Sequence, residues 1–399
     1  MRQTHVILRS SPTSTRDPFL GPRAAALTGG DSVVTGVSVE VDDIDTRKIS
    51  ALRANTEVIA IAPVIPMKLI APVEVQETVE PEPAADTVAW GVEAVGAHTS
   101  PFSGDGIVVA VLDTGIDASH SAFTGVSIVQ KDFTGEGNDD QDGHGTHCAG
   151  TIFGRTTNST RIGVAPGVKQ ALIGKVLGAE GGSSAQIASA IQWAVDNGAN
   201  VISMSLGLDF PGIVEQLQAL GVPPAPATSL ALEGYRTNVQ LFERLASLIR
   251  AQAPLAQATV VIAASGNESG RNQNPPFEIA VSPPAVAEGV ISVAALGEGE
   301  QGLMVADFSN TGANVSGPGV RIVSAGTGGG LTAMSGTSMA APHVAGVAAL
   351  WAERIKTTSP LTPLQLTGRL IGSTITDGLQ AGFDPFDIGA GLVRAPQQG

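Results

Sequence analysis

Mostly apolar runs recur along the chain beyond about residue 90, and the run at 106–113 is continuous and closes on an aspartate. The runs lie at 106–113, 200–207, 258–266, 289–296 and 320–326. An apolar run without alternation is typical of a strand buried on both faces of a parallel sheet. Segments with helical periodicity separate the runs, as at 186–199. Strands that alternate with helices predict an α/β fold: a doubly wound, mostly parallel sheet with helices on both faces and functional groups beyond the carboxyl ends of its strands.

The first 71 residues have a different pattern, which predicts a small α+β domain. Strand-like runs occupy 5–10, 33–41 and 57–70, and a helical period covers 45–55 with Asp45 as its cap. Residues 72–88 are rich in Glu and Pro, which is typical of an exposed linker. The main domain is therefore expected to span 89–399.

One crossover within the main domain, at 208–258, is unusually long. Apolar residues recur in it at helical spacing, which predicts an amphipathic helix; they are Tyr235, Val239, Phe242, Leu245 and Ile249. We hypothesise that this segment shapes the rim of a cleft or a partner surface.

Composition narrows the function. The 399 residues carry a formal net charge of −15, which argues against nucleic acid or an anionic membrane as partner. The single cysteine, Cys148, rules out an internal disulfide framework. The first residues lack the apolar core of a signal peptide, and no apolar run approaches the ~18 residues of a membrane span. We expect a cytoplasmic protein, or a secreted one if an export signal has been removed.

A first candidate for catalysis is Ser338, in the stretch GTSMAAPHVAG (336–346). A serine at a helix N-terminus lies beside unpaired N–H groups that could hold an oxyanion. The plain alternative is a close-packed helix start. His343 cannot serve as its base, because five residues place it ~140° around the helix. We interpret His343 as a packed histidine hydrogen-bonded within the helix.

Two further stretches could supply a base and an acid. His144 lies between glycines in DGHGTHCAGTI (142–152), and Asp113 closes the apolar run GIVVAVLD (106–113). A carboxylate at the end of a buried strand is costly unless it is paired, and a histidine base needs such a group to orient it. Asp117 is a competing carboxylate. A zinc site formed by Asp142, His144, His147 and Cys148 is an alternative for this region.

Asn267 follows another apolar run, in ASGN (264–267). At the carboxyl edge of the sheet its amide could donate to an oxyanion. A plain turn asparagine is the alternative.

Together, DTGID (113–117), GHGTHCAG (143–150) and GTSMAAPHVAG resemble the subtilisin-like serine proteases, in their order along the chain. The resemblance extends from 89–97 to 389–395. It implies that Asp113 orients the base His144, that Ser338 is the nucleophile, and that Asn267 and the Ser338 N–H form the oxyanion hole. The implied activity is hydrolysis of peptide bonds through an acyl-enzyme.

The resemblance also implies how a protein or peptide substrate binds, namely as an extended strand along Ser205, Leu206 and Gly207. Ala263, Ala264 and Ser265 would form a wall of the primary specificity pocket. The small N-terminal domain resembles an inhibitory propeptide that is cut within the linker; a permanently attached domain is the alternative.

The resemblance implies no essential cofactor, and calcium is an open question. Residues 153–167 lack the carboxylates of the family's usual calcium loop, whereas an acidic cluster could hold the ion or form a solvated loop; it comprises Asp132, Asp139, Asp140 and Asp142. Among other functions, a catalytically silent peptide-binding homologue remains the main alternative. An esterase of the α/β-hydrolase type is disfavoured because GTSMA lacks the glycine two residues after Ser338. The acid-acting sedolisins are disfavoured because their base is a carboxylate.

Overall fold

The computed structural model describes residues 2–13, 34–73, 77–79, 87–254 and 256–397. Its central sheet has the strand order β16-β15-β14-β12-β7-β10-β8, with β17 paired to β15. All of these pairs are parallel except β15 with β16. The strands are β7 (Val108–Asp113), β8 (Ser127–Asp132), β10 (Gln170–Lys175), β12 (Val201–Met204), β14 (Val260–Ala264), β15 (Val290–Gly299), β16 (Gly302–Val305) and β17 (Val315–Pro318). The predicted α/β fold is confirmed.

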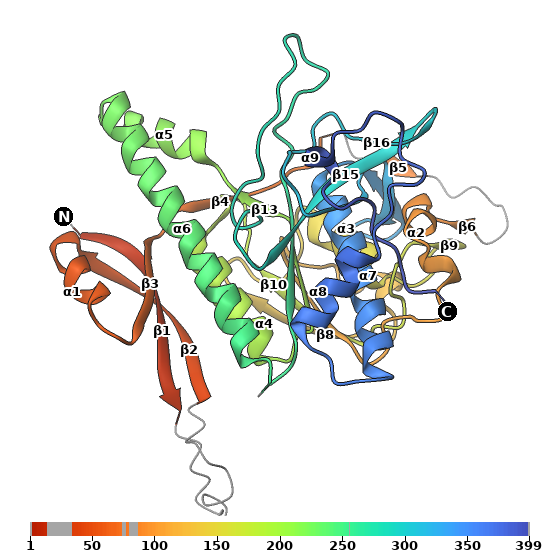
Figure 1. The fold of residues 1–399 in the computed structure, drawn as a ribbon, viewed down its shortest axis with the longest axis horizontal. Helices are drawn as coiled ribbons and strands as arrows, with labels where there is room; N and C mark the ends of the chain where they lie inside the picture. The colour runs from red at the N-terminus through yellow and green to blue at the C-terminus, as the bar shows by residue number, and fades with distance from the viewer. Residues whose placement is uncertain (1, 14–33, 74–76, 80–86, 255, 398–399) are drawn as a thin grey trace, which may run out of the picture.

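Helices cover both faces of this sheet (Figure 1), and the residues of strand β7 contribute to the core on each side. Val109 and Val111 belong to the core shared with α3 (His144–Phe153) and α7 (Thr337–Lys356). Ala110 and Leu112 point the other way, into the core shared with α4 (Ser184–Asp196) and α6 (Pro224–Gln252). Burial on both faces explains why the strand reads as an unbroken apolar run.

The run at 320–326 lies outside the central sheet. It forms β18 (Ile322–Ala325), which pairs antiparallel with β19 (Leu331–Met334), and β19 pairs with β5 (Glu77–Val79). A second small pair joins β6 (Thr87–Val88) to β9 (Thr160–Arg161). The remaining helices of this domain are α2 (Trp90–Ala94), η2 (Ala97–Thr99), η3 (Ser121–Phe123), α8 (Pro363–Gly372) and α9 (Pro385–Ile388).

The N-terminal unit is a three-stranded antiparallel sheet of order β2-β1-β3. It contains β1 (Arg2–Thr13), β2 (Val34–Asp45), η1 (Thr46–Lys48), α1 (Ile49–Arg53) and β3 (Val58–Pro63). Asp45 caps η1 by accepting the Arg47 N–H, as the sequence predicts. One face packs Ile7, Ile44 and Ile61 together, while the other face adds Val6, Leu8 and Ala62 to the core of α4 and α6.

The chain then leaves this small sheet and enters the main domain. Strand β4 (Pro66–Leu69) pairs antiparallel with β11 (Gly182–Ser183) and with β13 (Leu206–Leu208). Residues 66–69 therefore pair with strands of the main domain, although the sequence analysis groups them with residues 1–71. The predicted domain boundaries stay predictions, and most of the linker lies outside the described residues.

The long crossover consists of α5 (Phe210–Ala219) and α6, and the predicted amphipathic helix is confirmed. Phe242, Leu245 and Ile249 are buried against the main domain. The Asn238 side-chain amide donates to the Pro63 carbonyl (3.0 Å), so α6 also contacts β3. Figure 1 shows α6 (green) between the small sheet and the rest of the molecule.

Candidate active site

Asp113 and His144 meet at the carboxyl end of the central sheet. Asp113 ends β7 and His144 begins α3, and both side chains are almost fully buried. The His144 Nδ1–H donates to Asp113 Oδ1 at 2.7 Å. The Thr114 N–H donates to the same oxygen at 2.8 Å, which fixes the carboxylate against the end of its strand.

Glycine and threonine bring α3 this close to β7. A Cβ on Gly145 would lie 2.2 Å from the Gly115 carbonyl oxygen, so a side chain would push the helix away. The Thr114 hydroxyl accepts from the Gly145 N–H (2.9 Å) and donates to Asp140 (2.8 Å). Gly145 therefore allows the close approach of the α3 and β7 backbones.

The carboxylate also sets the protonation of the histidine. Burial by itself would lower the pKa of His144, but its interactions with Asp113, and then with the Cys148 side chain, outweigh burial and raise that pKa well above 6.5. The pair thus stabilises an imidazolium, the species that a general base becomes when it accepts a proton. The neighbouring thiol of Cys148 stays neutral, because burial raises its pKa.

Ser338 is the second residue of α7 and is fully buried. Cys148 Sγ lies between Ser338 and the Asp113–His144 pair. It is 3.8 Å from His144 Nδ1 and 3.4 Å from the Ser338 carbonyl oxygen. The Ser338 hydroxyl donates to the Ile70 carbonyl at 2.7 Å. Within the described residues, His144 Nε2 is buried and has no hydrogen-bond partner.

Asn267 lies at the same helix N-terminus and is held there by Thr337. The Thr337 N–H and hydroxyl both donate to Asn267 Oδ1, at 2.9 and 2.8 Å. This leaves the Asn267 Nδ2–H to donate to the Ala71 carbonyl at 2.9 Å. The sequence reasoning missed the orienting contact of Thr337, although this residue directly precedes Ser338.

A segment of the chain itself, residues 66–73, runs through the site as an extended strand. Lys68 pairs with Gly207 and Leu69 with Leu206, and the Ile70 N–H donates to the Ser205 carbonyl at 3.3 Å. Farther along, the Val73 N–H donates to the Ser335 carbonyl at 2.9 Å. Ser205, Leu206 and Gly207 thus accompany an extended strand in the way the sequence predicts for a substrate.

The residues predicted to form the pocket wall do not all lie on the same side of the sheet as this strand. Ala263, Ala264 and Ser265 are all buried, and Ala264 shares a core with Ile70, whereas Ala263 faces the opposite core. A Cβ on Gly207 would lie 3.0 Å from Ser282 Oγ and in ordinary contact with Ile70 Cγ1 at 3.5 Å, so Gly207 borders the Ile70 side chain.

The polar groups proposed for metals have protein partners instead. Asp140 accepts from Thr114, Gly143 and Thr146, and Asp132 accepts from Thr134 and two glycine N–H groups. His147 bonds the Ile322 carbonyl through Nε2 (2.8 Å) and Asp142 is exposed, so the zinc alternative is not assembled. Across the described residues, the group with metal-ligand spacing is Asp113, His144 and Cys148, which overlaps the candidate catalytic residues.

The two other candidates have structural partners. His343 bonds the Met339 carbonyl one turn earlier (2.8 Å), and burial lowers its pKa to about 4, which confirms the packed-histidine interpretation. Asp117 accepts from the Ser119 hydroxyl and from the Gly328 N–H. No helix in the described part of the chain has the length and apolarity to cross a membrane. The expected cytoplasmic location gains no support and stays a prediction.

Comparison with known proteins identifies the family of the chain. Residues 104–391 match the model of the subtilase family. The chain is 34% identical to subtilisin DY from Bacillus licheniformis, over 78% of this chain and 98% of that protein. It is also 34% identical to M-protease from Shouchella clausii, over 69% of this chain and 62% of that protein, and to subtilisin Savinase from Lederbergia lenta, over 67% and 84%. The chain belongs to the subtilase family and is a subtilisin-like serine endopeptidase.

Proposed function

We propose that this endopeptidase acts through Asp113, His144 and Ser338, and that it is made as a zymogen which cuts its own chain. The observation that carries the proposal is the contact of the Ser338 hydroxyl with a main-chain carbonyl, that of Ile70, at 2.7 Å. The N-terminal region delivers this carbonyl to the site as a bound strand and acts as an intramolecular inhibitor.

The chemistry follows from the positions of the groups. Ser338 Oγ attacks a peptide carbonyl while His144 Nε2, the free nitrogen of the pair, takes the hydroxyl proton. Asp113 stabilises the resulting imidazolium, and Asn267 together with the Ser338 N–H donates to the oxyanion. His144 then gives the proton to the leaving amine, and water releases the acyl group from Ser338.

The contacts favour Ile70–Ala71 as the bond that is cut. Ile70 continues the strand pairing, and its side chain is 2% exposed, as expected for a residue seated in a specificity pocket. The next bond, Ala71–Pro72, is a tertiary amide. The sequence alone suggested a cut within 72–88, whereas this proposal puts it just ahead of that linker.

The bound strand stops short of attack geometry. Ser338 contacts the Ile70 carbonyl while Asn267 contacts the Ala71 carbonyl, so the two catalytic groups engage consecutive peptide units. Cleavage at Ile70–Ala71 requires the Ile70 carbonyl to move into the oxyanion hole first.

The test combines fluorophosphonate labelling with N-terminal sequencing after incubation. We expect labelling and a new N-terminus at Ala71 in the native chain, and neither in Ser338→Ala. Ser127→Ala is the control, because it removes an exposed hydroxyl distant in sequence from Ser338. It should be labelled and cut as the native chain is. Labelling that persists in Ser338→Ala would disprove the assignment of the nucleophile.

A catalytically silent peptide-binding homologue is the second candidate, because Ser338 is hydrogen-bonded to the bound strand and not to His144. Peptide binding without labelling or cleavage would favour it.

A further inference from the structure

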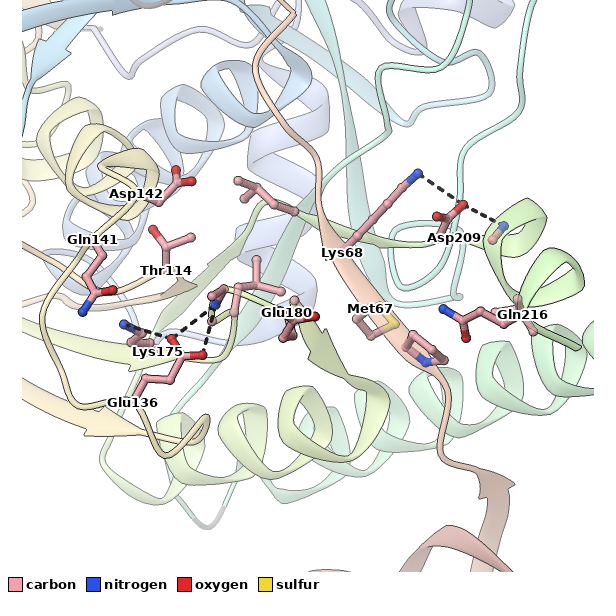
Figure 2. Close-up of a pocket in the computed structure, with 18 residues that line it drawn as sticks. Met67, Lys68, Thr114, Glu136, Gln141, Asp142, Lys175, Glu180, Asp209 and Gln216 are labelled. Atoms are coloured by element: carbon pink, nitrogen blue, oxygen red, sulfur yellow. Dashed lines mark hydrogen bonds and ion pairs between the residues drawn. The ribbon is translucent and has the colours of Figure 1, made fainter. Parts of the chain in front are cut away.

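The side chain of Lys68 lies against two carboxylates at the rim of the cleft. Lys68 Nζ is 3.3 Å from Asp209 Oδ1 and 4.0 Å from Glu268 Oε1. Lys68 belongs to β4, where it pairs with Gly207, two residues before Ile70. Figure 2 shows this side chain leaving the strand towards Asp209, on the side away from Glu136 and Lys175.

Other groups hold both carboxylates in place. Asp209 Oδ1 accepts the Gly212 N–H (3.2 Å) as the N-cap of α5. Glu268 Oε2 accepts from the side-chain amide of the buried Asn310 (2.7 Å), which directs Oε1 towards Lys68. The two acids therefore keep their orientation when another strand replaces β4.

Their positions tie them to substrate binding. Asp209 opens the long crossover immediately after β13, and Glu268 directly follows Asn267. The cavity of about 590 Å³ along β4 is lined by further acids, Glu136, Asp142 and Glu180. Besides Lys68, the cavity is lined by Lys175, which already donates to the Asp139 carbonyl and lies 3.9 Å from Glu136, so it does not offset Asp209 or Glu268.

We propose that Asp209 and Glu268 form a cation-selective subsite, which favours Lys or Arg two residues before the residue whose carbonyl is attacked. The subsite rests on the proposed function, and it gives the crossover a role at the rim of the cleft. Each carboxylate is more than a third exposed, so water and salt weaken the attraction.

The first experiment uses the self-processed enzyme and peptides of sequence VIPMKLIAPVE in which the lysine is kept or replaced by Gln or Glu. We expect kcat/KM about fivefold higher for the Lys than for the Gln peptide, a lower value again for Glu, and a smaller preference in 0.5 M NaCl. In Asp209→Asn combined with Glu268→Gln, the Lys-to-Gln ratio of kcat/KM should fall to about one.

Glu180→Gln is the matched control, because Glu180 lines the same cavity from the far side of the strand (Figure 2). It should keep the preference for Lys. A native enzyme that hydrolyses the Lys and Gln peptides equally well, or a double variant that still prefers Lys, would overturn the subsite.

A second measurement does not depend on catalysis. In the uncut Ser338→Ala chain, Lys68→Gln should lower the thermal unfolding midpoint when both carboxylates are present, and have no such effect in the double variant. If no peptide is hydrolysed but this coupling is found, the proposed function fails and the recognition of lysine stands. Absence of the coupling refutes the recognition itself.

Discussion

The two sheets of the molecule bury their faces in different ways. The central sheet lies between two helical layers of its own domain, and both faces are filled from within. The N-terminal sheet has a small core of its own around Ile7, Ile44 and Ile61, and its other face packs against α4 and α6. A unit this small buries little surface alone, so its stability depends on the domain against which it packs.

This difference separates two events in the proposed maturation. A cut at Ile70–Ala71 breaks one bond, but the apolar face that carries Val6 and Leu8 still holds the small sheet against the helices. Cleavage and release of the N-terminal unit are then distinct steps. Changes in one region should affect one step and leave the other intact.

The largest expected effect is on catalysis alone. Asp113→Asn should lower kcat/KM on a peptide about 10⁴-fold, because His144 loses the partner that orients it. The acid limb of the remaining activity should move to lower pH, since the charge that raises the pKa of His144 is gone and burial lowers it. A pH profile of kcat/KM measures both effects. An unshifted limb would contradict the role of Asp113, and docking of the small sheet should not change.

Asn267→Ala should affect both regions. We expect turnover to fall about 10²–10³-fold, the size measured for the oxyanion asparagine of subtilisin. The same change removes the donor to the Ala71 carbonyl, so residues 66–73 should be held less tightly. Steady-state kinetics and the protease sensitivity of the uncut Ser338→Ala chain report the two effects. Asn272→Ala, on an exposed loop, is the control; an equal loss there would speak against the assignment.

Leu8→Ala should affect the N-terminal unit alone. Leu8 is fully buried in the core shared with α4 and α6, so its truncation should cost about 2–5 kcal/mol of docking and folding free energy. Val41→Ala, at a site that is 50% exposed on the same sheet, should cost less than about 0.5 kcal/mol. Denaturation of the uncut Ser338→Ala chain tests the difference, while kcat/KM of the processed enzyme should be unchanged. Equal effects of the two substitutions would refute the shared core.

The smallest effect concerns the stability of the main domain in mild acid. Burial lowers the pKa of His147 to about 3 and of His343 to about 4, below the 6.5 of an unfolded chain. The unfolded state therefore binds protons first as pH falls, and each histidine should remove about 1 kcal/mol between pH 6.5 and 5.5. His144, with a raised pKa, contributes stability that is present below 6.5 and lost at higher pH. Urea unfolding at several pH values checks the slope, which His343→Gln should reduce; an unchanged slope in that variant would count against the buried neutral histidine.

The central sheet could be predicted from the sequence because strands buried on both faces are rich in consecutive apolar residues. The candidate site could be predicted from three motifs. It could not reveal that 66–69 leaves the small sheet, because that pairing joins Lys68 to Gly207 across a long stretch of chain. The contact of Lys68 with Asp209 could not be predicted for the same reason, because it depends on the register of this long-range strand pairing. The run at 320–326 was assigned to a strand correctly, but apolar character alone does not say which sheet a strand joins.

The consecutive carbonyls held by Ser338 and Asn267 bear on the timing of maturation. The nucleophile therefore waits for a local shift of the Ile70 carbonyl towards the Asn267 amide, with the strand register kept, in a strand that is covalently part of the same molecule. This shift of the carbonyl is a unimolecular step. We therefore expect the rate of the proposed self-cleavage to be independent of protein concentration, because each molecule cuts its own chain.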